Sequence, residues 1–400
     1  MNAQTLEARR SEMIHRGFKF KLSPTPGQGS QFRQFSGVCR LVYNLALEQR
    51  RDWWRHFRSA TGQHLNYAAQ CRELTKLRAE FDWIASVTQT CQQQALRDLD
   101  KAYANFFAGR AGYPSPRKRG DNDAFRFQAR ECETKRINAR WSAVRLPKIG
   151  WVKFRDTRPL QGTVKNVTVS QDAIGWHVSF ACEIEHKAPI NILPFVGIDR
   201  GVANTLSLST GEHLSVPASL WVIERKRRIA QRSASRKRLG SKRHAKAKRR
   251  VATLTARQAR IRRDWHHKTT LSLVRRFGTI VLEDLKVASM TASAKGTIEA
   301  PGKNVRQKAG LNRSVLNQGW FALETILAYK LEERGGHLCK VNPAYTSQTC
   351  SCCGTVDKKS RESQAVFSCQ HCGFRGHADH NAALNILRRN TASMHTEEAA

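Results

Sequence analysis

Alternating apolar and charged positions near the start of the chain predict a short strand at residues 18–22, where Phe18 and Phe20 are separated by lysine. Two prolines follow and end this pattern. From about Gln28, apolar residues recur every three or four positions, which predicts helices up to about Phe107 with a break near residues 59–63. A loop that contains Pro and Gly, residues 109–122, ends this helical segment.

The pattern changes to strands between residues 124 and 186. The segments VRLPKIGWVKFR, VKNVTVSQ and GWHVSFACEIE alternate in hydrophobicity and are separated by turn residues. The simplest organisation is a β-barrel or sheet that combines residues 18–22 with residues 124–186 and is interrupted by the helical insertion.

The second half of the chain alternates strands with helices. The run FVGID predicts a buried strand that is followed by a tight turn and a second strand, and GTIVLEDL predicts another buried strand. Residues 221–276 have a basic helical pattern, and residues 292–305 have the composition of a mobile loop. Residues 316–336 predict an amphipathic helix ended by two glycines, and residues 380–389 predict the final helix.

The charge balance points to a polyanionic partner. The 400 residues include 69 Lys and Arg but only 32 Asp and Glu, which gives a net charge of +37. Such an excess opposes compaction unless a polyanion neutralises it, and nucleic acid is the obvious candidate because each phosphate contact releases counterions. An anionic membrane surface is the alternative, but no strongly apolar helical face accompanies the basic residues.

The cysteines fall into two groups. Six of the eleven are dispersed and are typical of small core residues in a reducing compartment: Cys39, Cys71, Cys91, Cys132, Cys182 and Cys339. No apolar stretch approaches the ~20 residues needed to cross a bilayer, and the start of the chain lacks the apolar centre of a signal peptide. These features predict an intracellular protein without a membrane partner.

The remaining cysteines form a candidate metal site. Two C-x-x-C pairs, Cys350 with Cys353 and Cys369 with Cys372, are separated by 15 residues, and a glycine follows each pair. Four thiolates at this spacing predict a closed, structural zinc site. The alternatives are redox cysteines or a disulfide, and the neighbouring Cys352 lies outside the paired spacing.

Three acids form a candidate catalytic set. Asp199 ends one apolar run, Glu283 ends another, and Asp379 lies at the start of the final helix. Each has a structural explanation alone, as a turn residue, a strand-end charge and a helix N-terminal acid. Together they resemble the RNase H-like arrangement, in which acids hold two Mg²⁺ ions that activate water and stabilise a leaving 3′ oxygen. Asp284 is expected to point to the opposite face of its strand.

Several longer stretches resemble the TnpB family, the transposon-encoded RNA-guided nucleases related to type V CRISPR effectors. They extend from about residue 16 to 390 and comprise KFKLSPTPGQ, CRLVYNLAL, RLPKIGWVKF, VGIDRGVAN, RDWHHKTTLSLV, IVLEDL, LNRSVLNQGWFALETILAYKLEERGG, YTSQTCSCCG and FSCQHCGFRGHADHNAALNIL. The terminal block of cysteines and acid is the most specific of them. Two positions depart from the family pattern: Arg200 replaces a common apolar residue, and His377 lies where many relatives carry another acid.

The resemblance implies a multidomain α+β fold. It comprises an N-terminal wedge β-barrel with a helical insertion, then an RNase H-like (RuvC) α/β nuclease domain with an inserted zinc ribbon. The implied boundaries are a wedge strand at 1–27, a helical recognition lobe at 28–110, the rest of the wedge at 111–194, the nuclease domain at 195–345, the ribbon at 346–374, the final helix at 375–390 and a disordered tail at 391–400.

The resemblance also implies a function. Asp199, Glu283 and Asp379 match RuvC-type catalytic acids that bind Mg²⁺, and the four paired cysteines match zinc ligands. The implied partners are a guide RNA from the transposon end and double-stranded target DNA. The implied state is a monomer in a prokaryotic cytoplasm, associated with the nucleoid.

The basic helical segment is the candidate nucleic-acid surface. Between residues 225 and 250 lie fourteen Lys and Arg with almost no acids, so intrahelical pairing cannot neutralise them. The nine residues expected to contact phosphate are Arg225, Lys226, Arg227, Arg228, Lys237, Arg238, Lys242, Arg243 and Lys246. A basic channel of this kind can hold an RNA–DNA hybrid by its backbone. Trp53, Trp54, Trp221 and Trp265 are candidates for base stacking or for core packing.

Two other functions compete with a nuclease. One is a transposase that joins DNA strands itself, but the chain has no His-hydrophobic-His motif of the kind that tyrosine strand-transfer enzymes use. The other is a non-cleaving RNA-guided repressor, which the presence of all three acids disfavours.

Overall fold

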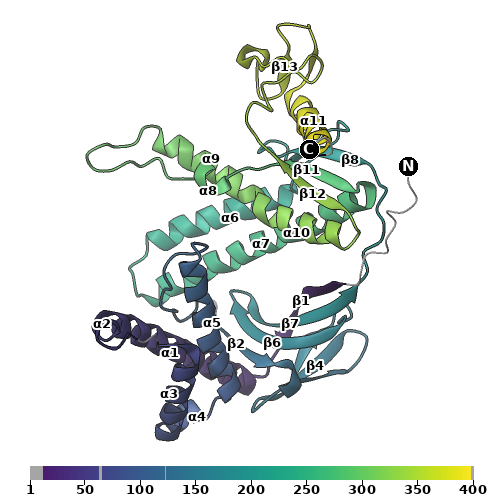
Figure 1. Ribbon diagram of the computed structural model, residues 1–400. Coiled ribbons are helices and arrows are strands. Elements are labelled where there is room, and N and C mark those ends of the chain that lie inside the picture. The colour runs from purple at the N-terminus through teal and green to yellow at the C-terminus, as the bar shows by residue number, and fades with distance from the viewer. Residues whose placement is uncertain (1–11, 63–64, 122, 398–400) are drawn as a thin grey trace. The chain divides into compact units, whose positions relative to one another are not determined.

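In the computed structural model the chain divides into two units, each with its own hydrophobic core (Figure 1). The N-terminal unit is Ser11–His186 and the C-terminal unit includes Lys187–Ala400; the structure describes residues 12–62, 65–121 and 123–397. Both units combine sheets with helices, which confirms the α+β class. Among the described helices, none is both long and apolar enough to span a membrane. The domain boundaries and domain roles given above stay predictions.

The N-terminal unit contains a seven-stranded sheet with the strand order β2-β6-β7-β1-β5-β4-β3. Its strands are β1 (Glu12–Ser23), β2 (Ala124–Gln128), β3 (Glu133–Arg136), β4 (Trp141–Leu146), β5 (Gly150–Arg155), β6 (Thr163–Asp172) and β7 (Gly175–His186). β1 pairs with β7 along most of its length and with β5 only at its last two residues, so it joins two halves of the sheet. Within the described residues no ladder pairs β2 with β3, so the sheet is open where a fully hydrogen-bonded barrel would be closed.

The helices between β1 and β2 confirm the predicted helical segment, with more breaks than the sequence indicated. They are α1 (Pro26–His56), α2 (Arg58–Thr61), α3 (Tyr67–Glu80), α4 (Asp82–Ala85) and α5 (Gln89–Phe107). β1 ends at Ser23 and α1 begins at Pro26, where a capping box between Thr25 and Gln28 satisfies its first N–H groups. α1 and α5 pack with the sheet around aromatic residues such as Phe32, which is fully buried.

The C-terminal unit is built on a five-stranded sheet with the order β10-β9-β8-β11-β12. Its strands are β8 (Phe195–Asp199), β9 (Leu206–Leu208), β10 (His213–Leu214), β11 (Thr279–Glu283) and β12 (His337–Val341). β11 is parallel to both β8 and β12, and β9 returns antiparallel to β8. The sequence predicted β8, β9 and β11 but missed β12.

The helices of this unit differ from the predicted ones mainly in where they break. They are α6 (Ala218–Ser235), α7 (Lys242–Arg276), α8 (Val287–Met290), α9 (Val305–Gln318), α10 (Trp320–Glu332) and α11 (Ala378–Glu397). The basic segment is two helices rather than one, and Gly319 separates α10 from α9, which the sequence did not predict. α11 continues to Glu397 because no Gly or Pro ends it, whereas a disordered tail was predicted from residue 391; residues 398–400 lie outside the described part.

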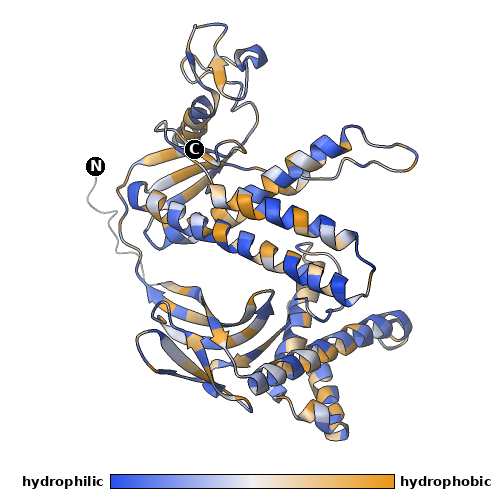
Figure 2. Cartoon of the chain, turned by 180° about the vertical axis from the view of Figure 1, so that it is seen from behind, coloured by the Kyte–Doolittle hydropathy of each residue, from blue (hydrophilic) through white to orange (hydrophobic). Residues whose placement is uncertain are grey.

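Helices cover both faces of the five-stranded sheet. The hydrophobic cluster on one face joins β8 and β11 to α7 and α10, through residues such as Ile198, Ile280 and Leu327. On the other face Val281 packs with Ile386 of α11. The strands of this sheet are mostly hydrophobic in Figure 2, as expected for a sheet covered on both sides.

Candidate active site and metal centre

The strand register brings Asp199 and Glu283 to the same face of the sheet. β8 and β11 are parallel neighbours with Ile198 opposite Leu282, so the next residue of each strand is one of the two acids. Side chains alternate along a strand, and Val281 faces α11; Glu283, two residues later, therefore faces α11 as well. Asp379 lies in the first turn of α11. The structure thus brings together all three acids that the sequence singled out.

Gly197 sets how closely α11 can approach the acids. It lies two residues before Asp199, and a Cβ at this position would lie 2.2 Å from the backbone oxygen of Ala383 and 2.7 Å from the backbone nitrogen of Leu387. Only a residue without a side chain allows α11 to pack this tightly on β8. This contact fixes the distance of Asp379 from the ends of the strands.

The acids interact through their charges. Burial and the charges on Glu283 and Asp379 raise the pKa of Asp199 from 3.8 to about 7, although Arg361 and a backbone hydrogen bond act in the opposite direction. Burial also raises the pKa of Glu283, although the hydroxyl of Thr346 donates a hydrogen bond to its Oε1. A site in which two carboxylates disfavour the ionisation of a third is one that a cation would stabilise.

Two neighbours contact the carboxylate of Asp379, and a third contacts its backbone. The amide of Asn204 donates to its Oδ2 at 3.3 Å, and the guanidinium of Arg361 lies 3.6 Å from its Oδ1. The backbone N–H of Asp379 donates to Nδ1 of His377 at 3.3 Å. Sequence reasoning missed Asn204 and Arg361, because nothing in the spacing of residues 204, 361 and 379 indicates that they meet.

The opposite face of the strand ends carries a different set of charges. Arg200 is buried, forms an ion pair with Glu324 of α10 at 3.1 Å, and donates to the backbone oxygen of Glu283. Lys340 pairs with Glu324 at 2.6 Å and with Asp284 at 3.6 Å. Asp284 is therefore directed away from the three acids, as expected from the alternation of side chains.

Two hydrogen bonds that involve the side chain of Gln318 fix the turn that follows β8. Gln318 is fully buried at the end of α9; its amide donates to the backbone oxygen of Val202 at 3.2 Å and its oxygen accepts from the hydroxyl of Thr205 at 2.9 Å. These bonds hold the turn on both sides of Asn204, which contacts Asp379. The turn beside the acids is thus anchored to the helical layer.

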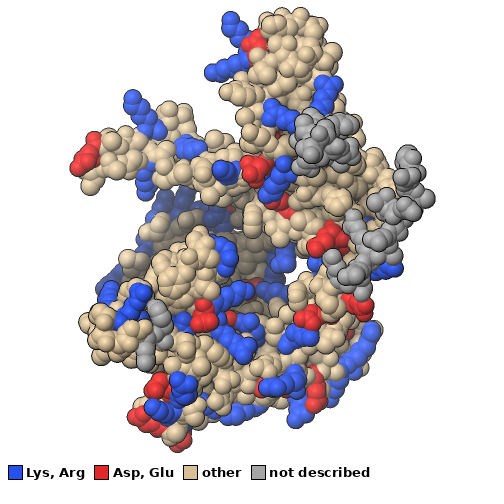
Figure 3. All heavy atoms as spheres, viewed as in Figure 1, with Lys and Arg blue, Asp and Glu red and all other residues tan. Residues whose placement is uncertain are grey.

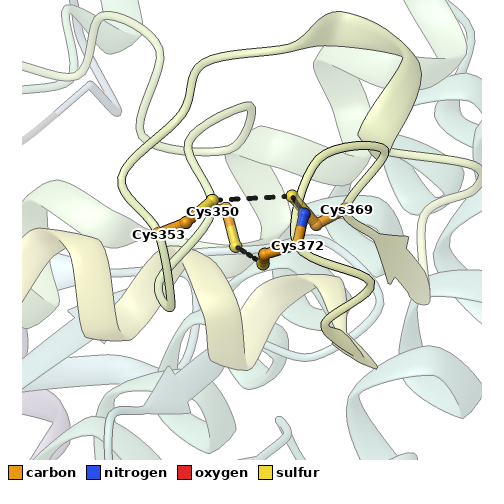
Figure 4. Close-up of side chains that lie close together, drawn as sticks. All are labelled: Cys350, Cys353, Cys369 and Cys372. Carbon is orange, nitrogen blue, oxygen red and sulfur yellow. Dashed lines mark hydrogen bonds between the residues drawn. The ribbon is translucent and has the colours of Figure 1, made fainter.

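The four paired cysteines form a second cluster, and Figure 4 shows their side chains directed toward one another. The sulfurs of Cys350 and Cys372 lie 3.7 Å apart, as do those of Cys353 and Cys369. A zinc ion bound tetrahedrally at ~2.3 Å would place its sulfur ligands about 3.8 Å apart. All eleven cysteines are free thiols in this structure. The cluster can therefore hold a metal ion.

The local backbone supports this cluster. The glycines after each cysteine pair, Gly354 and Gly373, have φ of +78° and +72°, the left-handed region that glycine adopts without strain. Hydrogen bonds from Thr355 lower the pKa of Cys353 to about 6, and backbone N–H groups lower the pKa of Cys369. Both effects favour the thiolate, the form that binds metal, at Cys353 and Cys369, whereas burial raises the pKa of Cys350.

The acids are more widely spread than the cysteines. Among the described residues, the cysteine group is the only set of three or more Cys, His, Asp or Glu whose ligand atoms all lie within 4.8 Å of one another. The carboxylates of Asp199, Glu283 and Asp379 consequently do not surround a single point in this conformation.

Hydrogen bonds from α11 connect the two clusters. Asn381 and Asn385 are buried one helical turn apart. The amide of Asn385 donates to the backbone oxygens of Thr346 and Thr349 at 3.0 and 2.6 Å, and Asn381 accepts from the backbone N–H of Ser351 at 2.8 Å. The segment that enters the first cysteine pair is therefore fixed to the helix that carries Asp379. The i, i+4 spacing of these asparagines is visible in the sequence and places both on one face of the predicted final helix.

The predicted nucleic-acid surface extends over α6, the start of α7 and the segment between them, which carries Lys237 and Arg238. Seven of its nine residues are exposed, and Arg227 and Lys237 are partly buried. Among the described residues none of the nine forms an ion pair with an acid, and the one acid in α6, Glu224, is buried and accepts from Asn317. Figure 3 shows lysine and arginine atoms gathered over this helix pair. The candidate stacking residues differ: Trp54 and Trp221 are exposed, whereas Trp265 packs against the core.

Comparison with known proteins identifies the family. The chain is 41% identical to the Escherichia coli protein named "Putative RNA-guided DNA endonuclease InsQ" over 92% of this chain and 91% of that protein. The chain belongs to the TnpB family. A Streptomyces pristinaespiralis protein named "Putative RNA-guided DNA endonuclease" is 33% identical over 96% of this chain and 91% of its own length. The resemblance drawn from the sequence motifs is confirmed.

Family models and solved structures agree with membership of the TnpB family. The models described as "Helix-turn-helix domain", "Probable transposase" and "Cas12f1-like, TNB domain" match residues 13–59, 179–294 and 320–386. A cryo-EM structure of a Cas12f1–sgRNA–target DNA complex has the same fold, with a TM-score of 0.57 and 16% identity over 90% of this chain and 83% of that chain. In the described part of residues 13–59, a strand and one long helix replace a helix-turn-helix.

Proposed function

We propose that this chain is an RNA-guided DNA endonuclease of a transposable element, in which Asp199, Glu283 and Asp379 bind two Mg²⁺ ions. The observation that carries the proposal is the convergence of the three carboxylates on one face of the sheet, close enough that the charges of Glu283 and Asp379 raise the pKa of Asp199. The names of the most similar full-length relatives support an endonuclease guided by RNA.

The residues present fit divalent cations. Carboxylate oxygens are the ligands that Mg²⁺ prefers, and β8, β11 and α11 each supply one acid that two ions could share. When bound, such ions would polarise an attacking water and neutralise the charge that develops on the leaving 3′ oxygen. Without them, the raised pKa of Asp199 leaves part of its carboxyl population protonated near neutral pH.

The chain positions these ligands rigidly. Asp199 and Glu283 are the last residues of two hydrogen-bonded strands, and the hydroxyl of Thr346 orients the carboxylate of Glu283. Asn204 and Arg361 orient the carboxylate of Asp379, because Asn204 contacts its Oδ2 and Arg361 contacts its Oδ1. Preorganised ligands of this kind do not need to rearrange when charge develops in the transition state.

We assign zinc to Cys350, Cys353, Cys369 and Cys372. The sulfur spacing of 3.7 Å supports a tetrahedral four-thiolate site, and such a closed site is structural. Its role would be to fold the ribbon that carries Arg361 and that is fixed to α11 through Asn381 and Asn385.

We assign the nucleic-acid partners to the basic helices. The nine candidate residues of α6, α7 and the segment between them would neutralise the phosphates of a guide RNA derived from the transposon end, paired with target DNA. Their exposure and their lack of acidic partners among the described residues support phosphate binding.

A cleavage assay with matched variants tests the proposal. The wild-type protein would be purified with the RNA it binds in its host, the RNA would be sequenced, and DNA matching its guide would be incubated with the complex in Mg²⁺ buffer. We expect double-strand cleavage that Asp199→Ala, Glu283→Ala or Asp379→Ala reduces by at least 10³-fold. Asp284→Ala is the matched control, because Asp284 is adjacent to Glu283 but pairs with Lys340 on the other face.

The outcomes separate the competing functions. Bound RNA with no cleavage of matching DNA at any divalent ion concentration would indicate a repressor. Strand joining in the absence of RNA would indicate a transposase that acts directly. Equal activity of Asp199→Ala and wild type would remove the basis of the nuclease proposal.

A further inference from the structure

The N-terminal unit contains a cavity that the nuclease site does not use. It lies at the carboxyl ends of α1 and α5 and has a volume of about 750 Å³. Its aromatic lining consists of Trp53, Trp54, Tyr103, Phe106, Phe107 and Tyr113. Most of the other residues that line the cavity are arginines: Arg50, Arg51, Arg55 and Arg58.

The aromatic side chains contact one another and form a continuous surface. The rings of Tyr103 and Phe107 are stacked with centroids 6.1 Å apart, and Phe106 meets Tyr113 edge-on at 5.4 Å. The hydroxyls of Tyr103 and Tyr113 share a hydrogen bond of 2.9 Å, which holds this wall together. Trp54 and Phe107 are 51% and 71% exposed, so part of each ring is accessible to a ligand although Arg58 lies over one ring and Tyr103 stacks on the other. Grouped exposed aromatic rings of this kind mark binding surfaces.

The arginines give the cavity its charge preference. The guanidinium of Arg58 lies 3.5 Å from the ring centroid of Trp54, and that of Arg50 lies 5.3 Å from the ring of Tyr103. Arg50 also pairs with Asp100 at 3.0 Å. Within the described residues neither Arg55 nor Arg58 forms an ion pair, so two cations at the rim can meet an anion.

We propose that this cavity binds unpaired loop nucleotides of RNA, with bases stacked on Trp54 and Phe107 and phosphates held by Arg55 and Arg58. Flat aromatic faces beside guanidinium groups are the surfaces on which unstacked bases bind. A base in a duplex cannot offer its faces, because neighbouring pairs cover them. A peptide or a second copy of this chain would have to supply acidic side chains around a hydrophobic anchor, and with a net charge of +37 a second copy is poorly suited to do so.

The choice of RNA over DNA rests on the proposed function. A guide RNA folds on itself and therefore presents loops and bulges whether or not DNA is bound, whereas target DNA offers unpaired bases only in the strand that guide pairing displaces. The cavity is confined to the ends of two helices, which agrees with anchorage of a loop rather than with tracking of a long strand. The site would thus contribute to holding the folded part of the guide RNA.

Fluorescence anisotropy with defined hairpins tests this assignment on the full-length protein. The probe is an RNA hairpin with a ten-adenosine loop, and the references are a blunt RNA duplex of the same length and a DNA hairpin of the same sequence. We expect Trp54→Ala and Phe107→Ala each to weaken binding of the loop RNA by about tenfold or more, and to leave binding of the duplex unchanged. Trp54→Phe keeps an aromatic face and should recover most of the affinity.

A matched control is available in the same unit. Trp83 is 52% exposed and lies outside the cavity, so Trp83→Ala should bind the loop RNA as the wild type does. Equal loss on loop and duplex RNA, or no loss in the double variant Trp54→Ala with Phe107→Ala, would overturn the proposal. An equal loss on the DNA hairpin would overturn the assignment to RNA, and a change only in oligomeric state would make the cavity an interface between copies.

The experiments can reject the RNA-loop site without rejecting the proposed nuclease function, and the reverse. Wild-type cleavage together with unaffected loop binding in the variants would reject this site alone. Loss of loop binding in the variants of a protein that never cleaves DNA would support this site and reject the nuclease.

Discussion

Replacing Asp199 with Asn should stabilise the folded protein in magnesium-free buffer while abolishing cleavage. Burial and two neighbouring acids make ionisation of Asp199 unfavourable, so its pKa is raised from 3.8 to about 7. Asn has the same shape and can still accept the backbone hydrogen bond at this position, but it carries no charge. The substitution therefore removes a repulsion that the wild type tolerates only for the sake of metal binding.

The magnitude follows from the change in pKa. The rise from 3.8 to about 7 is a difference of about three, and each pKa unit corresponds to about 1.4 kcal/mol, so the ionised carboxylate destabilises the fold by at most about 4 kcal/mol. The side chain is partly exposed, and solvent screens its charge. We expect Asp199→Asn to raise the free energy of unfolding by about 2 kcal/mol at pH 8.

The pH dependence has a defined sign. Because the folded state has the higher pKa, it binds the proton more tightly than the unfolded chain. The contribution of Asp199 to the stability of the wild type is thus highest below pH 4. It decreases as the pH rises through about 7 and is constant at higher pH. The advantage of Asp199→Asn should be absent near pH 4 and fully developed at pH 8.

Urea unfolding between pH 5 and pH 8 without added Mg²⁺ measures this advantage. Asp284→Asn is the control, because Asp284 is exposed and pairs with Lys340. Addition of Mg²⁺ should stabilise the wild type and affect Asp199→Asn little. A variant that is less stable than the wild type at pH 8, or an advantage that does not grow with pH, would refute the coupling of these acids.

Four further changes test other parts of the site. Gly197→Ala should destabilise the protein by about 1–3 kcal/mol in urea unfolding and reduce cleavage, because its Cβ would lie 2.2 Å from Ala383; Gly17→Ala, with open space around it, is the control. Arg361→Ala removes a charge that lowers the pKa values of the acids, so the pH profile of cleavage should shift to higher pH. Asn385→Ala leaves two backbone oxygens without their donor and should destabilise the protein by about 1–3 kcal/mol in urea. Cys369→Ser should lower bound zinc, measured by metal analysis, and reduce cleavage while RNA affinity is retained.

The parts of the fold that the sequence predicted are those with strong periodicity. β8 and β11 are uninterrupted apolar runs, and the helices of the N-terminal unit repeat apolar positions at helical spacing. β12 was missed because only its last residue, Val341, is fully buried and polar residues occupy much of its length. The break between α9 and α10 was missed because Gly319 lies within an otherwise continuous apolar pattern.

The acids could be singled out from the sequence, but most of their surroundings could not. Asp199 and Glu283 end apolar runs, so a local rule locates them. Arg361 approaches Asp379 only because the ribbon folds back on itself, and the contact of Gln318 with the turn after β8 spans more than 100 residues. Such contacts depend on the tertiary fold, and no periodicity along the chain reports them.

The segment that carries the cysteine cluster contacts two of the three acids directly. Thr346, just before the first cysteine pair, donates to Glu283, and Arg361, between the pairs, contacts Asp379. The second pair also fixes this arginine, because the backbone N–H of Gln370 donates to the hydroxyl of the buried residue Ser360 at 3.2 Å. A metal bound by the four thiolates would therefore act on the acids at two points without contacting either of them. Loss of that metal should disorder the positions of both Thr346 and Arg361, and so impair the active site even though all three acids remain in the chain.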